Sequence, residues 1–140
     1  MTDQEMYHEL AYYTLSHPHA RFIHQHVVDA FTAQTATTET KSIAIYYALV
    51  GLYLYVEKNY TGKEVQMAHV QLSNTPKIFE PLDLPKDRGD YTIQDVLKHP
   101  PGNERDEAIH KWCVCVWDIY KNQRTPVKEF ADRLFLYVSS

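Results

Sequence analysis

The sequence predicts an all-α fold: one domain over residues 1–140, a bundle of six to seven helices around a buried central helix at about 42–58. Three observations support this prediction. Apolar residues recur at helical spacing along most of the chain, and no segment alternates apolar and polar residues as a half-buried strand would. A chain of 140 residues is also long enough to bury one substantial core.

The central helix gives the clearest pattern. Residues 43–56 read Ile-Ala-Ile-Tyr-Tyr-Ala-Leu-Val-Gly-Leu-Tyr-Leu-Tyr-Val, and a helix that is apolar on every side is buried. Ala44, Ala48 and Gly51 fall on one side of this helix, which allows a neighbouring helix to approach closely. Glu57 follows them at a position where its carboxylate would be at least half buried. A buried charge needs a partner, so Glu57 is expected to have one.

Two helices are expected before the central one, at about 3–16 and 19–34, separated by His17-Pro18 because proline disfavours a helical residue before it. After it, capping boxes at Thr61 and Thr92 open helices at about 61–73 and 92–98. A long helix is expected at about 103–120. The last helix is expected to begin at Thr125-Pro126 and to end near residue 138.

The connection at 74–91 is long for a compact domain, and such connections are usually functional or packed over a surface. Four apolar residues predict that it packs on the core: Ile78, Phe79, Leu82 and Leu84.

Charge and hydropathy exclude several classes of partner. The net charge is -4 with the eight histidines neutral, and Lys and Arg are scattered singly, so no nucleic-acid partner is expected. No apolar run is long enough to cross a bilayer, and the first residues lack the order of a signal peptide. The expectation is a cytoplasmic protein without a membrane partner.

Candidate chemistry centres on the second helix, where four histidines fall within ten residues and Asp29 follows. His24 and His26 both lie inside the apolar arc of the expected helix, but they point about 160° apart, so a regular helix cannot offer both to one metal ion. His26 and Asp29 are three residues apart, so the carboxylate is placed to orient the imidazole. His69 lies at the edge of the apolar stripe of the fourth helix.

Imidazoles and carboxylates from facing helices form metal sites in helical bundles. The sequence therefore leads to the hypothesis of a small metal-binding protein or metal-dependent enzyme that holds one divalent transition metal (Zn, Fe, Mn or Ni). Its candidate metal residues are His24, His69, Glu57, Asp29 and His26. Of these, His24, His69 and Glu57 would be ligands and Asp29 would orient them. The sequence identifies no catalytic residue, because it contains no His-Glu-x-x-His motif.

Other interpretations remain open. The histidines would be structural if hydrogen bonds to Asp29, Glu57 and tyrosines satisfy them in the core, and acid–base chemistry without a metal is a further option. The main alternative function is a non-catalytic module that binds a small-molecule ligand or another protein. In that case the tyrosine-rich core or the 74–91 connection would form the contact surface. A third alternative is a homo-oligomer in which part of the central helix packs against a second copy of the chain.

Six residues of the second helix follow the pattern His-x4-Asp-Ala-aromatic-x2-Gln: His24, Val28, Asp29, Ala30, Phe31 and Gln34. This helix resembles the signature helix of an uncharacterised bacterial family, a domain of unknown function, and the likeness continues to Glu57. The resemblance implies a helical domain without an established activity. It also implies that two histidines of some members are replaced here by Thr35 and Tyr46. A looser likeness, to helical-bundle metalloproteins with three histidines on separate helices, would use His8, His24 and His69.

Overall fold

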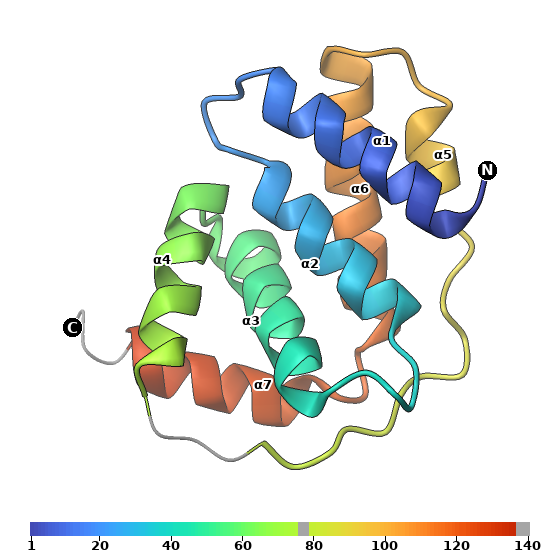
Figure 1. Ribbon diagram of the computed structural model, residues 1–140. Helices are drawn as coiled ribbons and strands as arrows, with labels where there is room; N and C mark the ends of the chain where they lie inside the picture. Colours follow the sequence, from blue (N-terminus) through green and yellow to red (C-terminus); the bar gives the residue numbers. More distant parts are fainter. Residues whose placement is uncertain (76–78, 137–140) are drawn as a thin grey trace.

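The computed structural model describes residues 1–75 and 79–136, and every regular element in these ranges is a helix. Figure 1 shows their arrangement, with α3 in the middle of the bundle. The helices are α1 (Asp3–Ser16), α2 (His24–Thr35), α3 (Ser42–Lys58), α4 (Gly62–Ser73), α5 (Ile93–Leu97), α6 (Asn103–Ile119) and α7 (Arg124–Ala131), followed by the π-helical turn η1 (Asp132–Leu136). The predicted all-helical single domain is confirmed.

Helix α3 is the axis of the core, because α2, α4, α6 and α7 all pack against it. Its residues from Ile45 to Tyr55 are buried except Tyr47, as expected for a helix that is apolar all round. The burial does not extend to its first turn, where Ile43 is 44% exposed and Ala44 is also at the surface. This turn lies at the edge of the bundle, so the expectation of burial on every side holds only for the middle of the helix.

The local signals for helix starts are confirmed where the cap is formed by neighbouring residues. Thr61 and Thr92 each accept a hydrogen bond from the first turn, and the carboxylates of Glu64 and Asp95 accept one from the cap backbone N–H. The last helix begins earlier than expected, with Gln123 as its cap, so Pro126 is its third residue. Its expected end near residue 138 lies outside the described residues.

The second helix begins at His24, five residues later than the sequence suggested. Phe22 interrupts it, because its φ of 51° is left-handed. This conformation is unusual for a bulky residue and costs about 1–3 kcal/mol unless its surroundings enforce it. Here the start of α4 enforces it. The Gly62 N–H donates to Arg21 O at 2.7 Å, and a Cβ on Gly62 would lie 1.6 Å from Phe22 O.

The segment from 79 to 92 runs past α7 and then along the side of the bundle to α5 (Figure 1). Phe79, Leu82 and Leu84 are half-buried and pack against the core, which confirms that this connection is held on the surface. Phe79 stacks on Tyr46 of α3, with ring centres 4.3 Å apart. Ile78 lies outside the described residues. In the described part of the chain, none of the helices has the length and hydropathy that a membrane span requires.

Candidate functional site

Two of the expected metal residues lie in separate helix interfaces. His24 is half-buried between α1 and α2, with its Nδ1 2.8 Å from Thr14 Oγ1, and burial lowers its pKa. His69 lies between α3 and α4, where its Nε2 donates to Tyr47 O at 2.8 Å. Burial lowers the pKa of His69 as well, although this bond opposes the shift. Both imidazoles therefore serve as links between packed helices.

Glu57 lies at the junction of α3, α6 and α7, where 30% of its side chain is exposed. Its Oε2 accepts a hydrogen bond from Trp117 Nε1 at 2.7 Å, and its Oε1 lies 3.4 Å from Lys128 Nζ. The expected partner of this carboxylate is thus an indole and an ammonium group. The contact joins α7 to the end of α3, so Glu57 stabilises the packing of the last helix.

His26 is buried, with 1% of the residue exposed, and its ring stacks on Tyr55 of α3 at 3.6 Å between ring centres. Neither ring nitrogen has a hydrogen-bond partner among the described residues. Burial lowers the pKa of His26 to about 3, helped by Arg21, His110 and His19 nearby. The imidazole is therefore neutral at physiological pH and keeps an unpaired N–H in the core.

Asp29 is also buried, one helical turn further along α2. Its Oδ1 accepts a hydrogen bond from Gln25 Nε2 at 3.1 Å, whereas its Oδ2 has no partner among the described residues. Burial raises the pKa of Asp29 well above its usual range. The carboxyl group faces Gly51 of α3, where a Cβ would lie only 1.9 Å from Oδ2. The expected hydrogen bond between Asp29 and His26 is not formed.

The structure therefore brings only His26 and Asp29 near each other, as neighbours on α2 that both face α3. His24, His69 and Glu57 occupy three other interfaces. In residues 1–75 and 79–136, no group of three or more His, Cys, Asp or Glu side chains is arranged to hold a metal ion.

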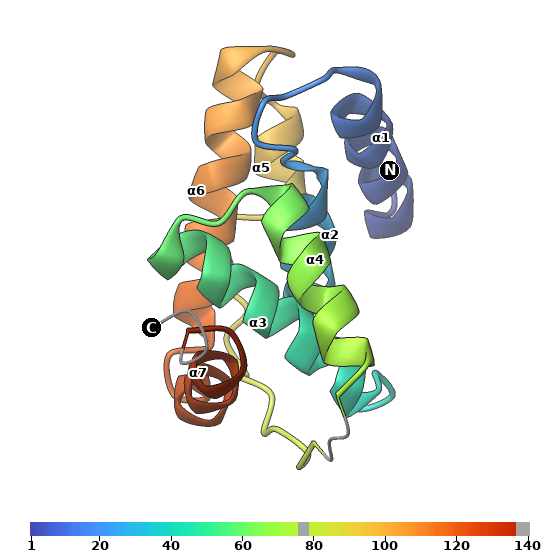
Figure 2. The same ribbon diagram turned by 90° about the vertical axis from the view of Figure 1, so that its left-hand side faces the viewer.

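Polar side chains converge instead at a pocket of about 430 Å³, which we call the His110 pocket. The loop between α1 and α2, the end of α3 and the N-terminal half of α6 form its walls. Figure 2 shows these segments together: the loop runs beside the upper part of α6, and the end of α3 lies below. The pocket is lined by His19, Arg21, Ile23, Tyr55, Asn59, Asn103, Asp106, Glu107 and His110.

The loop before α2 fixes two of these side chains. The Arg21 guanidinium donates through one nitrogen to Asn59 O and Oδ1, at 2.8 and 3.0 Å. His19 Nδ1 accepts a hydrogen bond from the Arg21 backbone N–H at 3.0 Å. Because a backbone N–H can only donate, Nδ1 of His19 carries no proton and its N–H is at Nε2. The left-handed Phe22 ends this loop, so backbone strain accompanies the placement of Arg21.

A second imidazole is oriented by α3. Tyr55 Oη lies 2.6 Å from His110 Nδ1. This hydrogen bond holds the His110 ring in place, and burial raises the pKa of Tyr55, so its phenol stays protonated. The Nε2 of His110 lies on the far side of the ring from this bond. His26 stacks beneath the same Tyr55 ring, so the unpaired imidazole lies directly behind the pocket wall.

Helix α6 supplies the acidic side of the pocket. Asp106 Oδ1 accepts a hydrogen bond from Tyr13 Oη at 2.7 Å, which holds the carboxylate in place. Its Oδ2 lies 4.0 Å from His19 Nε2, too far for a hydrogen bond. Glu107 adds an exposed carboxylate next to it. The pocket thus presents N–H donors from one wall and carboxylate oxygens from another.

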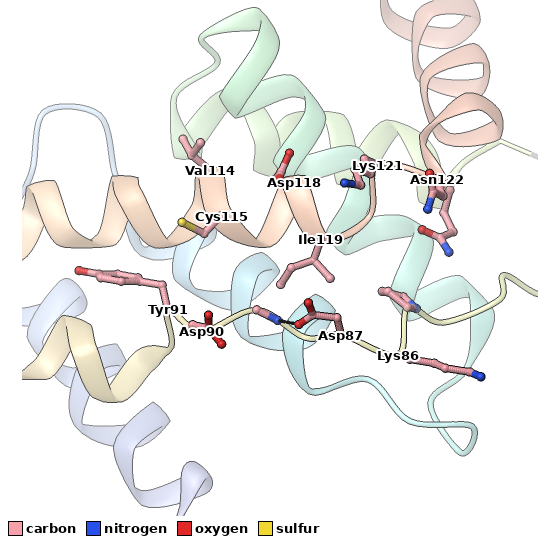
Figure 3. A pocket seen from close by; sticks show the side chains of 13 residues that line it. Lys86, Asp87, Asp90, Tyr91, Val114, Cys115, Asp118, Ile119, Lys121 and Asn122 are labelled. Carbon is pink, nitrogen blue, oxygen red and sulfur yellow. Dashed lines mark hydrogen bonds between the residues drawn. The ribbon is translucent and has the colours of Figure 1, made fainter.

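A larger pocket of about 670 Å³, the Ile119 pocket, lies between residues 85–91 and the C-terminal half of α6. Figure 3 shows Asp87 and Asp90 on the segment, and Asp118 on the helix across from them. All three carboxylates are exposed, and Asp118 lies 3.8 Å from an Arg124 nitrogen. Hydrogen bonds between different elements do not fix them in the described structure, so this pocket is less organised than the His110 pocket.

Sequence reasoning missed Arg21, Tyr55, Asp106 and His110. His19 was noticed only as one of a run of histidines. These residues come from three segments far apart in the chain, and none of them forms a recognisable motif. Two signals were available: Glu107 and His110 are three residues apart on one helix, and His110 lies off the apolar stripe of that helix. Both are also typical of ordinary surface residues.

The fold and the pocket define an all-helical domain with a polar ligand-sized pocket at one end. The chain belongs to a family of unknown function (DUF5946), whose model matches residues 4–121. This confirms the resemblance to an uncharacterised family. No curated protein and no solved structure matches the chain. All residues that line the His110 pocket lie within the matched region, whereas α7 lies beyond it.

Proposed function

We propose that this protein is a small-molecule-binding module and that the His110 pocket is its binding site. The observation that carries this proposal is the convergence of oriented hydrogen-bonding groups on one pocket from three separate parts of the chain. A volume of about 430 Å³ falls within the range of small-ligand sites.

The positioning of these groups supports binding rather than a purely structural role. Arg21 and Asp106 are each held by a hydrogen bond from outside their own helix or loop, yet each keeps polar atoms that are not used in this way. Such side chains lose little freedom when a ligand binds, which favours affinity. His26 behind Tyr55 has no hydrogen-bond partner for either ring nitrogen among the described residues, which costs stability, and such costs concentrate at functional sites.

A thermal-shift screen of a fragment library tests the proposal with three proteins: wild type, His110→Ala and the control His8→Ala. His8 is exposed on α1 and remote from the pocket lining. At a concentration about tenfold above Kd, a ligand adds about 1.4 kcal/mol, or about 3–6 °C in Tm. We expect fragments that stabilise wild type and His8→Ala by this amount but not His110→Ala. Equal shifts in all three proteins, or none, would contradict the proposal.

The divalent metal ion expected from the sequence stays a prediction. Elemental analysis of untagged protein tests it, since a metal site predicts one equivalent of Zn, Fe, Mn or Ni per chain. Mutating His24, His69 or Glu57 would then reduce the metal content. A cytoplasmic location, the lack of a nucleic-acid partner and a homo-oligomer also stay predictions.

A further inference from the structure

We infer that the His110 pocket binds a small zwitterion of the amino-acid type, with a carboxylate and an ammonium group on the same molecule. This inference rests on the proposed function and names the ligand class of the same site. It follows from the distribution of donors and acceptors over the pocket walls.

The loop wall suits a carboxylate. Arg21 carries a permanent positive charge, and its guanidinium has nitrogens beyond the one that contacts Asn59. His19 adds an N–H at Nε2, because its Nδ1 is occupied by the backbone of Arg21. Charge-assisted hydrogen bonds from such groups to a carboxylate are stronger than neutral ones.

The α6 wall suits an ammonium group. Asp106 uses Oδ1 for Tyr13, while Oδ2 stands 4.0 Å from His19 Nε2 without a hydrogen bond to it. Glu107 is next to it in the lining, with an exposed carboxylate. An ammonium group has three donors and no acceptor, so it fits between these oxygens.

A ligand with one charge would fit this pocket less well. A simple anion would meet the carboxylates of Asp106 and Glu107, and a simple cation would meet Arg21. Like charges placed together at a binding site select against the wrong ligand. Ile23 and the Tyr55 ring supply an apolar surface for the body of the ligand.

Calorimetric titration of the full chain with L-leucine, N-acetyl-L-leucine and L-leucinamide tests this inference. The three probes share one side chain; N-acetylation removes the positive charge of leucine, and amidation removes the negative charge. We expect L-leucine to bind at least about tenfold more tightly than either single-charge analogue, because each analogue loses one charge-assisted contact.

Two variants with matched controls separate the contacts. Glu107→Gln should weaken L-leucine about tenfold but should not weaken N-acetyl-L-leucine, whose negative charge Glu107 repels. Glu104→Gln, at an exposed glutamate on the same helix outside the lining, should have no effect. Arg21→Gln should weaken L-leucine and spare L-leucinamide, with Arg133→Gln as its control. Because Glu107 is exposed, its variant keeps the test valid even if Arg21→Gln fails to fold.

If one single-charge analogue binds as tightly as L-leucine, the zwitterion inference is overturned, but the proposed function stands. If library fragments bind in a His110-dependent way but none of the three probes binds, the zwitterion inference is likewise overturned and the proposed function stands. If neither the fragments nor the probes depend on His110, both proposals fail.

Discussion

At Gly51, α3 packs closely against Asp29 of α2, and replacing this glycine by alanine should destabilise the fold. A Cβ at this position would lie 1.9 Å from Asp29 Oδ2, 2.7 Å from Asp29 Cγ and 3.2 Å from Val65 Cγ1. Alanine in a helix interior normally stabilises by about 0.5–1 kcal/mol relative to glycine. Overpacking a buried site costs about 1–3 kcal/mol, and the buried Asp29 has little room to move. We expect a net loss of about 1–2 kcal/mol.

A double-mutant cycle shows whether Asp29 causes this loss. Urea unfolding of wild type, Gly51→Ala, Asp29→Ala and the double variant can be followed by the fluorescence of the buried Trp112 and Trp117. Without the Asp29 carboxylate the nearest contact is Val65 at 3.2 Å, so Gly51→Ala should become neutral or slightly stabilising. The expected coupling is about 1–3 kcal/mol. An equal effect of Gly51→Ala in both backgrounds would refute the close packing of Asp29 on α3.

The remaining predictions concern pH and the last helix. The raised pKa of Asp29 means that the native state binds its proton more tightly, so this group lowers stability as pH rises above about 3.8; Asp29→Asn should remove that loss. His26 has the opposite effect, because its pKa is lowered to about 3 and the native state resists its protonation. This group therefore lowers stability as pH falls below about 6.5, and His26→Phe should remove this loss while keeping an aromatic ring against Tyr55. Unfolding free energies measured from pH 4 to 8 check both, and curves parallel to wild type would contradict them. Glu57→Ala should cost about 1–2 kcal/mol by leaving the Trp117 indole unpaired; a melting temperature equal to that of the wild type would show that the Glu57 contacts contribute nothing.

The sequence predicted those parts of the fold that depend on neighbouring residues. The capping boxes at Thr61 and Thr92 placed two helix starts correctly, because a cap needs only residues within one turn. The apolar segment that became α3 identified the core. By contrast, the start of α2 was wrong, because the left-handed Phe22 is enforced by Gly62, forty residues away.

The candidate site was harder to predict, for a physical reason. Sequence reasoning selected polar residues on apolar helix faces, and these proved to be buried residues such as His26 and Asp29 or links between helices such as Glu57. The His110 pocket draws mostly on exposed and half-buried residues from a loop, the end of α3 and the N-terminal half of α6. Their meeting depends on the path of the loop that holds Arg21, and neither periodicity nor spacing reports such a path.

The most direct test of the His110 pocket as the binding site is a two-dimensional ¹H–¹⁵N NMR titration with the fragments that stabilise the protein. If the His110 pocket binds these fragments, the largest shifts fall on the backbone amides of Arg21, Asn59 and His110, and the imidazole N–H of His110 moves with them. Shifts centred on residues 85–91 and Cys115 would instead show that the fragments bind in the Ile119 pocket and that the His110 pocket is not the binding site.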